Sequence, residues 1–311
     1  MNRESTLGLT VWLAMLAIAP WVSGIATVER YFLFAPMVVV PLGFGLLSRW
    51  NWDSEKWPAF QRAAQFQAPA AFLVIASFFQ DATLWSALLT VPWLAVGVLA
   101  AIHGVTYWCR RGMRFESLVV LSATTYLFIG ACWLFASRVG MNPAGFQEPI
   151  VLLTAVHFHY SGFAAVLITG TLASRCAIDR RFLSLSRLIC AGTILSMPLI
   201  SLGFVFYLPF KVISIFFLAL CLAGAALLTL WLSHEPSIHS ARVQLRVSSG
   251  AILAGMALAA LYGAGEYTQS PVIDLHEMAI AHGTLNALGF SFCGLWGWNL
   301  VSAKEAIWLH R

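Results

Sequence analysis

Long apolar runs alternate with short polar connections along the whole chain. A helix needs about 20 apolar residues to cross a membrane, and runs of this kind recur too often for the core of a water-soluble domain. We therefore predict ten transmembrane helices. They lie at residues 7–28, 31–48, 65–80, 84–107, 117–137, 150–172, 188–207, 212–232, 248–265 and 277–300.

Basic residues gather in alternate connections. The N-terminus and every second connection contain 15 of the 18 Lys and Arg residues. These are Arg3, Arg49, Lys56, Arg62, Arg110, Arg111, Arg114, Arg175, Arg180, Arg181, Arg187, Arg242, Arg246, Lys304 and Arg311. The connections in between contain only Arg30, Arg138 and Lys211. Because Lys and Arg in short loops favour the cytoplasmic side, the pattern predicts ten spans with both termini in the cytoplasm.

The composition indicates the same fold class. Apolar residues make up 60% of the chain and charged residues 10%, which is outside the range of soluble globular proteins. Ten spans of about 20 residues use roughly two-thirds of the chain, so the connections are too short for a soluble domain. We predict an all-α, polytopic transmembrane helical bundle that forms one integral membrane domain over residues 1–311.

Charge and cysteine content exclude some classes of function. The net charge of +5 is explained by the basic cytoplasmic connections, which can also contact anionic lipid headgroups. We therefore expect membrane lipids and no nucleic acid as partners. The six cysteines lack CxxC spacing, so we expect no disulfide and no zinc knuckle. They are Cys109, Cys132, Cys176, Cys190, Cys221 and Cys293.

The sixth stretch contains ionisable residues, which are costly inside a membrane unless they are paired or hydrated. Glu148 and Pro149 precede it, and proline favours the first helical position, so Glu148 is expected at or beside the N-cap. His157 and His159 follow about 13 and 16 Å further along the axis, near the middle of the bilayer. On an α-helix, residues two positions apart point about 200° from each other. At most one of the two imidazole rings therefore faces a given partner.

The tenth stretch is the second exception. His282 and Asn286 are i,i+4 neighbours, and Gly289 and Cys293 continue the same stripe. Small residues on that stripe allow another helix or a ligand to approach closely.

Asp274, His276 and Glu277 precede the tenth stretch. Asp274 and Glu277 have the spacing of a capping box, in which each satisfies a free N–H group at the helix start. Structural alternatives exist for other residues as well: Glu148 stabilises a helix dipole, and a buried histidine commonly makes an interhelical hydrogen bond.

The sixth and tenth stretches both start on the outer side and run in parallel. Their carboxyl groups and imidazoles therefore share one half of the membrane, and we predict that the two helices lie side by side around one site. The catalytic candidates are Glu148, His157, His159, His276, Glu277, His282 and Asn286. The substrate-binding candidates are Phe158, Tyr160, Phe163, Thr284 and Phe290.

Two segments, Ala155–Phe163 and Ala281–Phe290, resemble the hallmark segments of the YndJ-like family of polytopic bacterial membrane proteins. The resemblance implies the architecture over most of the chain and a location in the bacterial inner (cell) membrane. It supports reading the intramembrane His and Asn residues as a site. It implies architecture better than activity.

Three functions compete. The first is an intramembrane isomerase or cyclase that performs acid/base chemistry on a lipophilic substrate of the isoprenoid, epoxide or polyene type. Glu148 or Glu277 supplies the proton, because burial in a dry site favours the protonated carboxyl group. The aromatic side chains form a wall that stabilises a developing cation.

The second function is a proton-coupled transporter, since titratable groups near the midplane are typical of proton relays. Against it, carriers commonly show paired repeats with broken helices, and the sequence shows only a weak similarity of this kind, between His103-Gly104 and His282-Gly283. The third is haem or metal binding through His157, His159 and His282, but an H-x-H pair on a helix points its rings apart. We therefore assign no cofactor and no metal, and expect a lipophilic small-molecule partner. The oligomeric state stays open.

Overall fold

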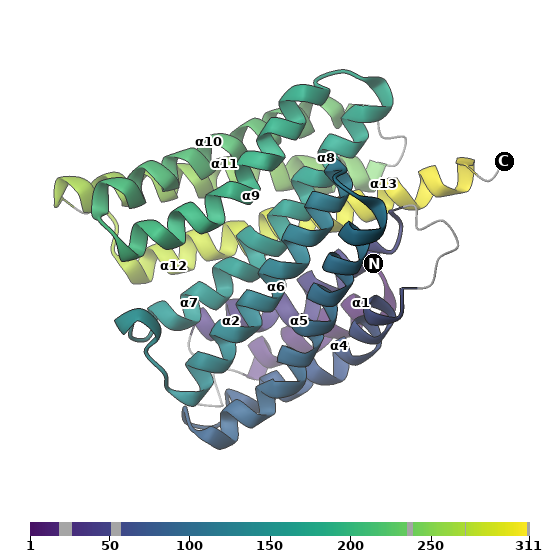
Figure 1. Ribbon diagram of the computed structural model, residues 1–311. Helices are drawn as coiled ribbons and strands as arrows, with labels where there is room; N and C mark the ends of the chain where they lie inside the picture. The colour runs from purple at the N-terminus through teal and green to yellow at the C-terminus, as the bar shows by residue number, and fades with distance from the viewer. Residues whose placement is uncertain (19–26, 51–56, 235–238, 271, 310–311) are drawn as a thin grey trace. The chain divides into compact units, whose positions relative to one another are not determined.

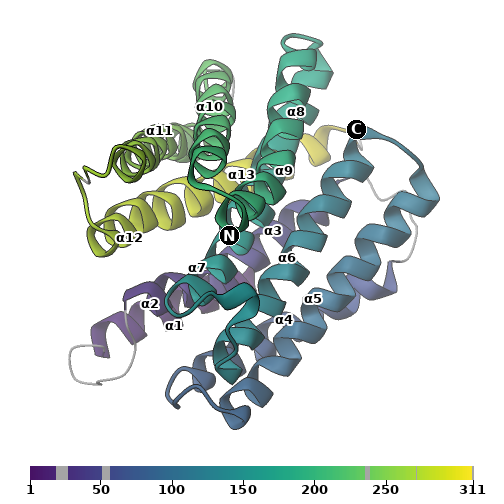
Figure 2. The ribbon, with the colours of Figure 1, turned by 60° about the vertical axis from the view of Figure 1, so that its left-hand side comes forward.

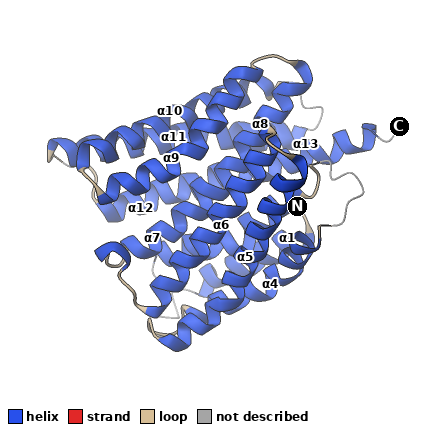
Figure 3. Ribbon diagram, viewed as in Figure 1, coloured by secondary structure: helices blue, strands red, loops and turns tan. Residues whose placement is uncertain are grey.

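The computed structural model describes residues 1–18, 27–50, 57–234, 239–270 and 272–309, and in these residues the regular structure is helical without a strand (Figures 1 and 3). The predicted all-α fold class is confirmed. Within the described residues, eight helical segments are long and apolar enough to span a membrane. They are Val28–Leu47, Leu84–Arg111, Phe115–Val139, Ile150–Ile178, Leu183–Val205, Leu208–Leu232, His239–Thr268 and Leu275–Ser302.

The described parts of the other two predicted stretches are mostly helical, but these helices do not meet the length and hydropathy required of a span. Helix α1 (Arg3–Ile18) has 16 residues, and residues 19–26 of the predicted first stretch lie outside the described residues. Helix α4 (Pro58–Ser77) starts seven residues before the predicted third stretch. Its first half contains Gln61, Arg62 and Gln65, which lower its hydropathy.

The chain divides into two compact units, Met1–Ala164 and Ala165–Arg311, and each is described by itself. The boundary lies inside the span Ile150–Ile178. The single membrane domain and the cytoplasmic termini stay predictions.

The first unit is built around one span that is almost completely buried. Besides α1 and α4, it comprises α2 (Thr27–Phe34), η1 (Ala35–Val39), α3 (Val40–Leu47), α5 (Leu84–Arg111), α6 (Phe115–Val139), η2 (Pro143–Gly145), α7 (Ile150–His157) and η3 (Phe158–Ala164). Helices α4, α5 and α6 pack as successive neighbours (Figure 2). In the span α2–η1–α3, every residue from Phe32 to Phe44 is buried.

Two prolines interrupt this buried span. Proline has no N–H group and cannot donate to the preceding turn. The turn η1 has π-helical geometry, in which the Val40 N–H donates to the Ala35 carbonyl five residues earlier. In this geometry Pro41 cannot serve the carbonyl of Pro36. Because an unsatisfied carbonyl inside a membrane protein is costly, this group needs another donor.

Side chains from other parts of the first unit donate to this carbonyl and to three others of the span. Tyr160 Oη–H donates to the Tyr31 carbonyl at 2.7 Å, and Gln67 Nε2–H of α4 donates to the Pro36 carbonyl. From α1 and the residue before it, Trp12 Nε1–H donates to the Arg30 carbonyl at 2.9 Å and Asn2 Nδ2–H to the Pro41 carbonyl at 2.8 Å. The interrupted span is therefore held by side chains from three separate parts of the first unit.

The second unit contains α8 (Ala165–Asp179), α9 (Leu183–Val205), α10 (Leu208–Leu232), α11 (His239–Thr268), α12 (Leu275–Thr284), η4 (Leu285–Phe292) and α13 (Cys293–Leu309). Helix α10 packs between α9 and α11, and α11 also packs along α12, η4 and α13. The segments η3 and η4 are π-helical and fall in the predicted sixth and tenth stretches. Periodicity predicted continuous α-helices there. Such π segments often mark functional sites.

We predict that Gln67→Ala lowers the free energy of unfolding by about 1–3 kcal/mol, because it removes the donor to a buried carbonyl. Gln65→Ala is the matched control, since Gln65 is exposed on the same helix. Thermal unfolding of both purified variants in detergent measures the difference. Equal melting temperatures for Gln67→Ala and the wild-type protein would contradict the role given to Gln67.

Candidate functional site

Glu148 is held at the start of α7 by two hydrogen bonds. Pro149 is the N-cap of this helix, so Glu148 lies beside the cap, as predicted. The Leu152 N–H donates to Glu148 Oε2 at 3.1 Å, and the Ser137 hydroxyl of α6 donates to Oε1. Both carboxyl oxygens therefore act as acceptors, while the residue remains exposed.

Helix α7 has one buried and one partly open face. Val151, Leu152 and Ala155 are buried. Ile150, Leu153 and Thr154 are half-buried and His157 is exposed, which is the i, i+3, i+4, i+7 stripe of an α-helix. His157 Nδ1–H donates to the Leu153 carbonyl at 2.7 Å. Because neutral imidazole has one donor and one acceptor nitrogen, Nε2 of His157 is the acceptor.

His159 points into the first unit and is completely buried. Its Nδ1–H donates to the Ala155 carbonyl at 2.8 Å, and its Nε2 accepts the Trp93 indole N–H at 3.1 Å. Both nitrogens of the neutral ring therefore have a hydrogen-bond partner. Protonation at Nε2 would place its N–H group opposite the Trp93 N–H group, two donors without an acceptor. His159 therefore has a positioning role within this unit. The prediction that His157 and His159 point to different neighbours is confirmed.

The surroundings of His159 are closely packed. A Cβ atom on Gly130 of α6 would lie 2.7 Å from His159 Nδ1, so only glycine fits against this ring. Phe32 meets the ring edge-on, with the ring centroids 5.2 Å apart. The buried span, α5 and α6 therefore all contact the residue at the start of η3.

The aromatic candidates of η3 pack against protein side chains. Phe158 is buried with its ring 5.8 Å from that of Tyr126, and Phe163 is fully buried with its ring 6.0 Å from that of Phe44. Tyr160 is the donor to Tyr31 described above. Their predicted contact with a substrate stays a prediction.

Arg138 is a buried cation that the sequence analysis did not select. It lies in the last turn of α6 and is 7% exposed. Its Nη2 donates to the carbonyls of Ser77 and Gln80 at the end of α4. Its guanidinium lies 4.6 Å from the centroid of the Phe78 ring. Arg138 of α6 therefore supplies donors to carbonyl groups at the end of α4.

Three carboxylates, Glu29, Asp81 and Glu148, interact electrostatically with this cation. A signal for Arg138 existed in the sequence, because it is one of the three basic residues on the predicted outer connections. Lys211, another of these, forms an ion pair with Glu266 at 2.9 Å. These two exceptions to the charge pattern therefore each interact with carboxylates.

In the second unit, the acidic candidates cap a helix. The Glu277 N–H donates to Asp274 Oδ1 at 2.7 Å, and the Asp274 N–H donates to Glu277 Oε2 at 3.4 Å. The predicted capping box at the start of α12 is confirmed. Asp274, His276 and Glu277 are all exposed.

The polar stripe of the tenth stretch packs against α11. His282 Nδ1–H donates to the Gly255 carbonyl at 2.9 Å, and Asn286 Nδ2–H donates to the His282 carbonyl at 2.8 Å. A Cβ atom on Gly289 would lie 2.3 Å from the Ala251 side chain. The small residues thus allow a close helix approach, as expected, and the partner is α11.

The remaining two candidates differ in exposure. Thr284 is exposed, and its hydroxyl donates to the Ile280 carbonyl at 2.7 Å. Phe290 is buried, and its carbonyl accepts the Ser248 hydroxyl at 2.9 Å. This last bond ties η4 to α11.

The site candidates therefore form two groups, one in each unit. The first contains Glu148, His157 and His159, and the second contains His276, Glu277, His282 and Asn286. Because the groups belong to different units, their predicted side-by-side arrangement stays a prediction. Among the described residues, no group of three or more His, Cys, Asp or Glu side chains has a metal-binding arrangement.

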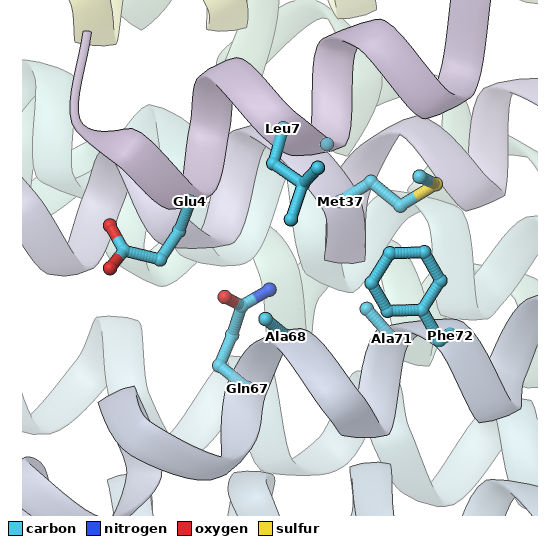
Figure 4. Close-up of a pocket in the computed structure, with 8 residues that line it drawn as sticks. Glu4, Leu7, Met37, Gln67, Ala68, Ala71 and Phe72 are labelled. Carbon is cyan, nitrogen blue, oxygen red and sulfur yellow. The ribbon is translucent and has the colours of Figure 1, made fainter. Parts of the chain in front are cut away.

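A small open cleft lies elsewhere in the first unit, between α1, η1 and α4 (Figure 4). Its volume is about 250 Å³ including the part open to the surroundings. Leu7, Met37 and Phe72 form its apolar side, while Glu4 and Gln67 supply polar groups. None of the predicted substrate-binding residues lines this cleft.

Comparison with known proteins shows the relationship of this chain. The profile of a family described as YndJ-like protein matches residues 30–290. The chain belongs to the YndJ-like family. It is 29% identical over 250 residues to a protein of Bacillus subtilis (strain 168) described as uncharacterized membrane protein YndJ. This YndJ-like chain is accordingly a multi-pass membrane protein.

The aligned region covers 78% of this chain and 44% of the Bacillus protein, so the chain spans less than half the length of that relative. No solved structure matches the chain. The family match includes both segments on which the resemblance was based, Ala155–Phe163 and Ala281–Phe290.

We predict that Gly289→Ala lowers the free energy of unfolding by roughly 1–3 kcal/mol, because the added methyl group overpacks the contact with Ala251. Gly250→Ala is the matched control, since a Cβ atom there meets nothing within 4 Å. Thermal unfolding in detergent compares the two variants. If both are as stable as the wild-type protein, η4 and α11 do not approach as described.

Proposed function

We propose that this YndJ-like protein is a membrane-embedded acid/base enzyme, an isomerase or cyclase, that acts on a lipophilic substrate of the isoprenoid, epoxide or polyene type. The observation that supports it is the Glu148 carboxyl group. It is exposed, yet both oxygens are positioned by donors from different helices. A positioned and accessible carboxyl group is what proton transfer requires.

The hydrogen bonds favour one direction of proton transfer. Glu148 accepts from an N–H and an O–H group, and Arg138 lies close enough to interact with it electrostatically. These are the surroundings of a carboxylate that removes a proton. We therefore favour proton abstraction and return, the chemistry of an isomerase, over the protonation of an alkene that starts a cyclisation.

His157 is the second group that we assign to the reaction. It belongs to the partly open stripe of α7, and its acceptor nitrogen Nε2 is opposite the nitrogen bonded to Leu153. An exposed imidazole within a span is costly next to lipid tails, so we propose that water or substrate covers this stripe. The proposed location is the bacterial cell membrane.

A specific observation also favours a second candidate, a proton-coupled transporter. The buried span α2–η1–α3 contains Pro36 and Pro41 and is π-helical between them, and transporters commonly bind substrates at helices whose regular hydrogen bonding is interrupted. Proteoliposomes containing a pH-sensitive dye test this candidate. Proton flux above that of empty liposomes favours transport, whereas the enzyme proposal expects none.

We predict that purified protein incubated with bacterial lipid extract in D₂O transfers deuterium into a lipid component detectable by mass spectrometry. Glu148→Gln should reduce the rate of deuterium incorporation about 100-fold or more, as expected for loss of a general base. Glu116→Gln is the control and should leave the rate unchanged, because Glu116 lies at the end of α6 opposite to Ser137.

Equal deuterium incorporation by Glu148→Gln and the wild-type protein would refute the role of Glu148. If the wild-type protein incorporates no deuterium and shows substrate-driven proton flux, the transporter proposal replaces the enzyme proposal.

A further inference from the structure

The second unit carries a group of arginines at one end, independent of the candidate site. Helices α8 and α10 end there, and helices α9 and α11 begin there. The group consists of Arg175, Arg180, Arg181, Arg187, Arg242 and Arg246. These six residues are all arginine, although lysine would satisfy the topological preference for positive charge equally well, and Lys304 of α13 belongs to the same predicted side.

The turn between α8 and α9 presents part of this group. Arg180, Arg181 and Arg187 are exposed. The turn is anchored on α10: the Phe182 ring lies 5.2 Å from that of Trp231, and the Arg181 guanidinium lies 5.9 Å from the same ring. The backbone at Arg180 and Phe182 is left-handed, with φ of 55° and 53°. These residues therefore have a defined place at the end of the unit.

Exposed apolar side chains alternate with the arginines in the same segment. Ile178 is 65% exposed, Leu188 is 69% exposed and Phe182 is 47% exposed. A surface that combines exposed aliphatic and aromatic side chains with arginines suits the boundary between acyl chains and headgroups. A soluble anion without acyl chains would not contact the apolar side chains.

We propose that the turn between α8 and α9 binds the phosphodiester headgroup of an anionic phospholipid. The planar guanidinium group donates two parallel hydrogen bonds to phosphate oxygens, which the ammonium group of lysine cannot do. Arg180 and Arg181 contact the phosphate, and Phe182 and Leu188 enter the acyl region. By the charge pattern, this end of the unit faces the cytoplasm.

The test measures binding of fluorescently labelled phosphatidylglycerol to the full-length protein in detergent, with labelled phosphatidylcholine as the zwitterionic comparison. We expect phosphatidylglycerol to bind more tightly. Arg180→Gln with Arg181→Gln should weaken its binding about 25-fold, because each basic residue near an anionic surface contributes a factor of about five.

Two further variants separate this proposal from a purely topological role. Arg180→Lys with Arg181→Lys keeps the charge and the membrane orientation, and it should still weaken binding measurably because the paired hydrogen bonds are lost. Arg62→Gln with Arg114→Gln removes the same charge from the first unit and should change binding less than about twofold.

Three outcomes would overturn the proposal. The first is equal affinity for the two lipids. The second is equal weakening by the two pairs of glutamine substitutions. The third is displacement of the labelled lipid by glycerol 3-phosphate at the concentration at which unlabelled phosphatidylglycerol displaces it, which would identify a soluble phosphate as the ligand.

Discussion

The first unit depends on hydrogen bonds from surrounding side chains to carbonyl groups of its buried, proline-containing span. This span is buried from Phe32 to Phe44, and Pro41 leaves the Pro36 carbonyl without a donor from its own helix. Gln67 supplies that donor, while Tyr160, Trp12 and Asn2 bond to other carbonyls of the same span. The buried span therefore requires polar side chains that point inward from the surrounding helices. Tyr160 belongs to η3, so its bond to Tyr31 also ties the segment that carries His159 to this span.

Histidines two residues apart have different roles because their helix has one packed face. His159 lies between α5, α6 and the buried span, and both of its nitrogens are occupied in the neutral form. His157 is on the open stripe, where its hydrogen bond to Leu153 lies within its own helix. The buried imidazole orders the packing, and the exposed one is the imidazole for which we propose a chemical role. A site argued from residue type alone treats the two as equivalent.

The polar residues of the second unit serve helix packing. Asp274 and Glu277 cap α12, and His282, Asn286 and Gly289 meet α11 at short distance. Among the described residues, Glu148 is the exposed carboxyl group to which we assign proton transfer. Arg138 interacts with it electrostatically, and the adjacent Ser137 donates a hydrogen bond to it.

The sequence by itself determined the helices, because a membrane span requires a long apolar run and this requirement is visible in composition and length. It also determined local features that depend on neighbours in the chain, such as the capping box at Asp274 and the opposed directions of His157 and His159. Only the tertiary structure decided what each polar side chain contacts. The donors to Tyr31 and Pro36 and the hydrogen bonds of Arg138 join residues that are 31 to 129 positions apart, which periodicity does not relate. For that reason the same pattern that located the candidate residues did not separate a packing histidine from an accessible one.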